Sequence, residues 1–90
     1  MASQFIFVYS NIIKKQYDFT AKADTTTATY WSVDISTSGY SPIAFSVYNG
    51  NSLDIKIGVE WFDNGSIRGF YTCPVSSDVH VVFCIIYLRE

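Results

Sequence analysis

The sequence predicts an all-β protein, a small antiparallel β-sandwich of about six to seven strands. Val and Ile, which favour strands, together number 18 among the 90 residues, whereas Leu, Ala and Met together number only 8. Several segments also alternate apolar and polar side chains with a period of two, which is typical of half-buried strands. Because a chain of this length forms one domain, we expect a single sandwich.

The first segment is apolar without clean alternation, so residues 1–14 are predicted to be either a leader or linker, or an edge strand. The sandwich itself is predicted at residues 15–90. Its first strand carries Tyr17, Phe19 and Ala21 on one face. After a turn, one face of the second strand carries Thr27, Thr29, Trp31, Val33 and Ile35.

The stretch SGYSPI, residues 38–43, leads into the third strand. Gly39 is predicted to adopt a backbone conformation that other residues avoid. Pro42 is compatible with the start of a strand, because its missing N–H faces outward there. One face of this strand is then predicted to carry Ile43, Phe45 and Val47, and the other Ala44, Ser46 and Tyr48.

Two turns bound the fourth strand, which shows the cleanest alternation in the chain. The first turn is Asn49-Gly50-Asn51, and the second, Asp63-Asn64-Gly65, is predicted to close a hairpin because Asn-Gly tolerates positive φ angles. The apolar face between the turns is predicted to comprise Leu53, Ile55, Ile57, Val59 and Trp61. The return strand, residues 66–73, is predicted to place on one face Ile67, Gly69, Tyr71 and Cys73.

The last strand, residues 79–88, is apolar on both faces, which indicates burial on both. One face carries Val79, Val81, Phe83, Ile85 and Tyr87, and the other carries Val82, Cys84, Ile86 and Leu88. The first set fills the core. Either the N-terminal segment or another chain must cover the second set, and we favour another chain because apolar patches of this size usually mark interfaces.

Composition excludes several function classes. A net charge of −2 with 16% charged residues argues against a nucleic-acid partner, which requires clustered Lys and Arg. The longest apolar runs are too short to insert into a membrane, and the N-terminus has no signal-peptide pattern, so we expect synthesis in a cytoplasm. Cys73 and Cys84 fit no metal-ligand spacing, and we expect reduced, buried thiols, although a disulfide between them is an alternative.

No catalytic constellation is evident, so we predict no enzymatic activity and no cofactor. His80 is the only histidine, and it lies ~13 Å along its strand from Cys84, too far for a nucleophile and its base. Asp54 and Glu60 lie ~20 Å apart on one strand, farther than the paired carboxylates of glycosidases.

Carbohydrate binding needs an aromatic ring to stack on a sugar, with amide, carboxylate or guanidinium groups nearby for the hydroxyls. Two turns and the following strand supply such groups, and the candidate ligand-binding residues are Tyr48, Asn49, Asn51, Trp61, Asp63, Asn64 and Arg68. The alternative is that Trp61 belongs to the core and the Asn residues only form turns. Arg68 could likewise pair with Glu60 across the hairpin, in a surface ion pair of little energetic value.

The stretch SGYSPI at residues 38–43 resembles the "SGYTPIG" element of C-terminal tip domains in bacteriophage tail-fibre and receptor-binding proteins, chiefly from phages of gut Firmicutes. Two further segments resemble that pattern, the strand with Tyr17, Phe19 and Ala21 and the apolar last strand ending at Arg89. The likeness covers residues 15–90. Ala44 stands where a Gly is common, and Trp61 and the two cysteines also depart from the pattern, which leaves the binding specificity open.

The resemblance implies a trimer at the distal end of a fibre that meets the host surface, through a glycan or a protein receptor. Such a protein is made in the cytoplasm of the bacterial host and functions in the virion. A last strand that is apolar on both faces agrees with trimer packing, with Val82, Cys84, Ile86 and Leu88 as the interface. Two alternatives remain, a purely structural trimerisation cap and a monomeric carbohydrate-binding or adhesin module of a bacterium.

Overall fold

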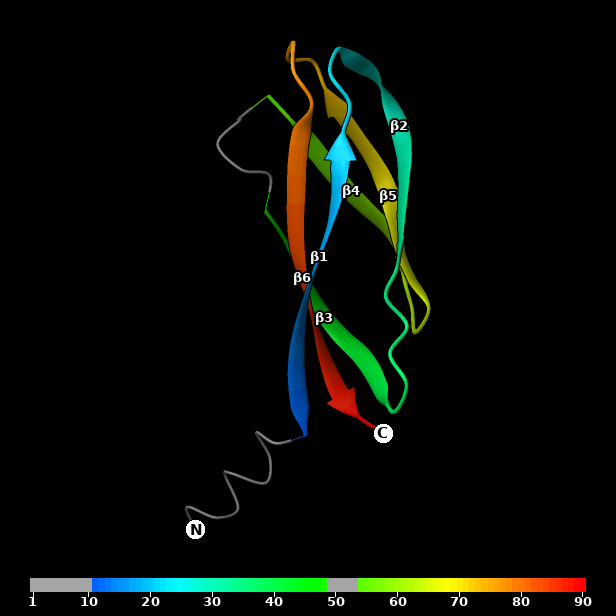
Figure 1. Ribbon diagram of the computed structural model, residues 1–90. Coiled ribbons are helices and arrows are strands. Elements are labelled where there is room, and N and C mark those ends of the chain that lie inside the picture. The colour runs from blue at the N-terminus through cyan, green and yellow to red at the C-terminus, as the bar shows by residue number, and fades with distance from the viewer. Residues whose placement is uncertain (1–10, 49–53) are drawn as a thin grey trace.

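The computed structural model describes residues 11–48 and 54–90, except for the side chains of Val47 and Tyr48 (Figure 1). Its elements are β1 (Ile12–Ala21), β2 (Thr25–Asp34), β3 (Tyr40–Tyr48), β4 (Lys56–Phe62), β5 (Ser66–Cys73) and β6 (Val79–Arg89). They form two antiparallel sheets of three strands, with the orders β1-β6-β3 and β2-β5-β4. The prediction of a small antiparallel β-sandwich is therefore confirmed.

The core lies between the two sheets and is dominated by aromatic rings. Phe19 stacks on Trp31 with ring centroids 4.5 Å apart, and Phe83 lies 5.8 Å from Trp31. A second aromatic contact, 5.0 Å between the centroids of Phe45 and Phe62, joins the edge strands β3 and β4. Large rings bury much apolar area per residue, which allows so short a chain to form a core.

The central strands β5 and β6 supply the inner faces that the alternation predicts. The buried residues on these two strands are Ile67, Gly69, Tyr71, Cys73, Val81, Phe83, Ile85 and Tyr87. Each central strand has hydrogen-bonded neighbours on both edges, so its backbone groups are paired along its length. The sheet registers are therefore fixed by burial as well as by hydrogen bonding.

A buried tyrosine connects the two sheets. The Tyr87 hydroxyl donates a hydrogen bond to the carbonyl oxygen of Ile35 at 2.7 Å, and it also shares a hydrogen bond with the Tyr17 hydroxyl. The pKa of Tyr87 is raised to about 12, chiefly by burial; Thr37 lowers it, and the contact with Tyr17 adds a smaller upward contribution. The core therefore favours the neutral phenol at this position.

Two β-bulges reverse the predicted orientation of large side chains. The pairing of β3 shifts between Pro42 and Ala44, and Ile43 at the bulge is 52% exposed. The pairing of β4 shifts between Val59 and Trp61, and Trp61 is 50% exposed beside Arg68. Because one extra residue inverts a period-2 pattern, the predictions that Ile43 shares a face with Phe45 and that Trp61 shares a face with Val59 are wrong.

Two of the predicted turns, at Gly39 and at residues 63–65, lie where the sequence predicts them, and the turn Asn49-Gly50-Asn51 lies outside the described residues. Gly39 has a φ of 81°, as expected for its turn. In the β4–β5 hairpin, neither Asn64 nor Gly65 has a positive φ, so that part of the prediction is wrong. The Asp63 carboxylate closes this turn instead, because its Oδ1 accepts hydrogen bonds from the backbone N–H groups of Gly65 and Ser66, both at 2.8 Å.

β1 begins at Ile12 and lies beside β6 at the edge of the sheet, so it does not cover the face of β6 that points away from the core. We call that face the outer stripe; it comprises Ile12, Val82, Cys84, Ile86 and Leu88. Ile86 is 36% and Leu88 44% exposed, while Val82 and Cys84 are half-buried. No described segment covers this apolar face.

The two cysteines are free and lie on different sheets. Cys73 is buried on the inner face of β5, as expected for a thiol that packs as a small apolar group. Cys84 is half-buried in the outer stripe, so the prediction of a buried thiol is met only in part.

Candidate functional site

The outer face of the β2-β5-β4 sheet brings together side chains from all three strands. Since the odd-numbered residues of β5 are buried, Arg68 and Phe70 point away from the core. The register places Tyr30 and Gly58 on either side of Phe70, and Trp61 beside Arg68. We call Tyr30, Trp61, Arg68 and Phe70 the aromatic face.

Three large aromatic side chains of this face are accessible to solvent. Tyr30 is 55%, Trp61 50% and Phe70 37% exposed. The rings of Tyr30 and Phe70 meet edge to face with centroids 5.9 Å apart. A gathering of exposed aromatic rings on one sheet face is unusual for surface without a function and marks it as a candidate recognition site.

Trp61 is held in place by its neighbours on both sides. The guanidinium carbon of Arg68 lies 4.8 Å from the centroid of the Trp61 ring, within the range of a cation–π contact. The indole Nε1 donates a hydrogen bond to Oδ2 of Asp63 at 2.7 Å. The alternative that Trp61 belongs to the core is therefore wrong.

Asp63 organises this end of the site. The pKa of the Asp63 carboxyl is lowered by hydrogen bonds that favour its charged form. The bond from the Gly65 backbone N–H has the largest effect, followed by those from the Trp61 side chain and the Ser66 backbone. Both carboxylate oxygens already accept hydrogen bonds from the chain itself. This geometry fixes the turn and the indole together, while the role of Asp63 as a ligand contact stays a prediction.

Arg68 and Glu60 line the same hollow without pairing. Lys22 and Asp78 form an ion pair at the surface, where His80 is also hydrogen-bonded to Asp18. No ion pair between Arg68 and Glu60 occurs among the described residues, so that alternative is wrong. The Arg68 Nε is buried and has no hydrogen-bond partner among the described residues. Neither Arg68 nor Glu60 is therefore neutralised by an ion pair within the described residues.

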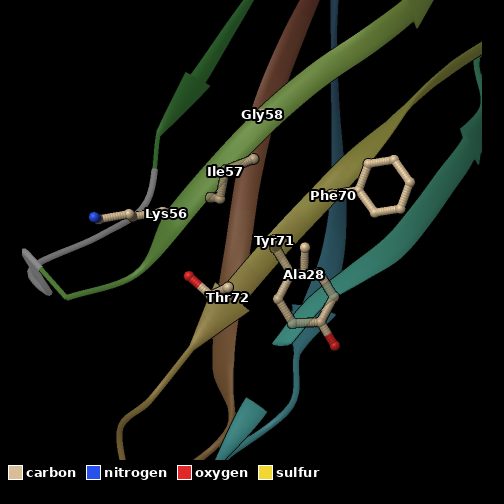
Figure 2. A pocket seen from close by; sticks show the side chains of 7 residues that line it. All are labelled: Ala28, Lys56, Ile57, Gly58, Phe70, Tyr71 and Thr72. Carbon is tan, nitrogen blue, oxygen red and sulfur yellow. The ribbon is translucent and has the colours of Figure 1, made fainter. Parts of the chain in front are cut away.

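The aromatic face contains two adjacent hollows. The first, of about 370 Å³, lies between β4 and β5 and extends to Ala28 of β2 (Figure 2). Its outward-facing lining includes Lys56, Gly58, Phe70 and Thr72. The second, of about 230 Å³, is lined by Tyr30, Glu60, Trp61, Arg68, Gly69 and Phe70. Phe70 borders both hollows, so they adjoin each other along β5.

The structure gathers part of the predicted site and adds residues that the prediction missed. Trp61, Asp63, Asn64 and Arg68 lie together at the β4–β5 hairpin, with Asn64 exposed in the turn. Asn49, Asn51 and the side chain of Tyr48 lie outside the described residues. The missed residues are Tyr30, Gly58, Glu60 and Phe70. Tyr30 and Phe70 carried a signal, because each occupies the non-core position of a strand whose other face is apolar.

Among residues 11–48 and 54–90, no three side chains with metal-binding groups come together. The same part of the chain contains no helix long and apolar enough to cross a membrane. The sequence matches no protein-family model, no curated protein and no solved structure.

Proposed function

We propose that the protein is a non-enzymatic carbohydrate-binding domain that acts as the receptor-binding tip of a bacteriophage tail fibre. The aromatic face carries this proposal. Apolar faces of sugar rings stack on aromatic side chains, while their hydroxyls need both donors and acceptors. Tyr30, Trp61 and Phe70 supply the rings, Arg68 supplies donors and Glu60 supplies acceptors, all on one open surface.

The fibre context rests on the likeness of residues 38–43, the first strand and the last strand to phage tip domains. The outer stripe supports it independently. Ile86 and Leu88 are exposed at the centre of a sheet, where a lone subunit gains nothing from large apolar side chains. Three subunits that pack these sheets around a common axis would bury them.

A structural cap is the second candidate, because the outer stripe alone would suffice to hold three fibre chains in register. The cap needs no ligand, whereas the carbohydrate-binding tip requires the aromatic face. The two candidates therefore differ in what the aromatic face does, and substitutions there distinguish them.

Replacing Trp61 or Phe70 with Ala is expected to weaken glycan binding at least about fivefold, since truncating a central aromatic residue of a binding site costs about 1 kcal/mol or more. Binding is measured on an array of bacterial surface polysaccharides and then by calorimetry with the best ligand. Ser76→Ala, an exposed change in the β5–β6 turn, is the control. Wild-type affinity in both aromatic variants, with an intact trimer, would favour the cap.

Replacing Ile86 with Asp is expected to convert a trimer into monomers, because a charge would be desolvated at the subunit contact. Light scattering after size exclusion should give about three times the 10.2 kDa of one chain for the wild type, and about one chain for the variant. Thr26→Asp, at an exposed position of β2, should remain trimeric. A wild-type monomer at micromolar concentration would contradict the proposed assembly.

A further inference from the structure

We infer that the aromatic face binds an extended oligosaccharide of two or more linked sugars, which lies along β5 and passes over Phe70. This inference rests on the proposed carbohydrate-binding function and specifies its ligand. It is carried by the arrangement of the two hollows, by the polar groups around them, and by a glycine that the backbone does not require.

The dimensions of the face exceed those of one sugar. The outward positions of β5 are Arg68, Phe70 and Thr72, and consecutive outward positions lie ~6.8 Å apart, so the row spans ~14 Å. The hollows of about 370 and 230 Å³ lie along this row, with Phe70 as their shared border. One sugar ring fills one hollow only, whereas a linked pair places a ring in each and its linkage over Phe70.

Polar groups occur at both ends of the row. Arg68 and Glu60 border the second hollow, and Lys56 and Thr72 border the first. Lys56 and Arg68 form no ion pair within the described residues. A ligand that reaches both ends therefore meets hydrogen-bonding groups at each, with an aromatic surface between them, which is the pattern that fits a short sugar chain.

The backbone conformation and packing at position 58 do not require a glycine. A Cβ built on Gly58 would have only the Phe70 carbonyl oxygen nearby, at 3.9 Å, and its φ lies outside the left-handed region. A β-branched residue would also suit a strand better than glycine. Since Ile57 and Val59 pack against the core, a side chain at Gly58 would project outward, into the first hollow. Its absence keeps that hollow open.

The test compares Gly58→Val with the wild type on an array of bacterial polysaccharide fragments graded from single sugars to hexasaccharides. The wild type should bind fragments of two or more sugars and show at least about tenfold weaker binding of single sugars. Gly58→Val should melt no lower than the wild type and lose at least about tenfold in affinity for the longer fragments.

A second variant shows whether a loss of binding by Gly58→Val reflects the filled hollow or misfolding. Ala28→Leu narrows the same hollow from β2, on the side opposite Gly58 (Figure 2), and should show the same loss. Thr26→Val, an exposed position of β2 outside the hollow, should bind as the wild type does.

The possible outcomes distinguish a failure of this inference from a failure of the proposed carbohydrate-binding function. If single sugars bind as tightly as longer fragments, or both hollow-filling variants bind normally, the inference is wrong and carbohydrate binding stands. If the wild type binds no fragment of any length, or binds only a protein from the host surface, the proposed function itself is wrong.

Discussion

Replacing Gly69 with Ala is expected to lower the free energy of unfolding by at least about 3 kcal/mol, a large share of the stability of a small domain. A Cβ at this position would lie 1.8 Å from the carbonyl oxygen of Gly58 and 2.8 Å from its carbonyl carbon. Both atoms belong to the backbone of β4, so no side-chain rotation relieves the overlap. The two strands would have to separate next to the bulge that turns Trp61 outward.

Gly58→Ala is the matched control, because it adds the same methyl group to the facing strand with its nearest contact at 3.9 Å. Urea unfolding followed by tryptophan fluorescence compares the two variants with the wild type. Gly58→Ala should be as stable as the wild type or more stable by up to about 1 kcal/mol. Equal stability of the two variants would show that β4 and β5 do not approach as closely as described.

Alkaline pH is expected to destabilise the protein through Tyr87. The pKa of Tyr87 rises from 10.0 to about 12 on folding, so the folded state holds the proton more tightly than the unfolded chain does. The resulting stability is complete below about pH 10 and is lost as the pH rises through about 12. A shift of this size corresponds to a free energy of unfolding on the order of 2–3 kcal/mol.

Tyr87→Phe isolates this effect, since other tyrosines and lysines also titrate in the same range. The variant should be less stable at about neutral pH, by ~1–2 kcal/mol, because the carbonyl oxygen of Ile35 loses its hydrogen bond. Its stability should then fall less steeply than that of the wild type between about pH 10 and 12. Parallel curves for the two proteins would contradict the burial of an ionisable phenol here.

Alternation predicted the inner faces of the central strands well and failed where the strands are irregular. Cys73 on β5 and Phe83 on β6 face the core as expected, because each follows an uninterrupted period of two. Ile43 and Trp61 depart from the faces that alternation predicts for them, because each adjoins a bulge whose extra residue cannot be recognised in the apolar pattern. Trp61 is still a predicted site residue, because the turn beside it supplies polar groups.

Which residues of different strands lie together in the site depends on the register between the strands, and the sequence does not reveal that register. Tyr30 and Phe70 lie forty residues apart and meet only because β2 pairs with β5 at that position. The role of Asp63 was hidden for a similar reason. Its position in a turn was evident, whereas its hydrogen bond to the indole depends on the bulge that rotates Trp61 toward it.

The outer stripe and the aromatic face belong to different sheets of one sandwich, so they point in opposite directions. Copies joined through the outer stripe would therefore display their aromatic faces outward, on separate sides of the assembly. On a surface that repeats the same sugar, several such faces engage at once, and linked binding of this kind strengthens attachment by about 10²–10⁴-fold. Contacts that are weak individually would then give firm attachment where the glycan is dense and only weak attachment where the sugars are sparse.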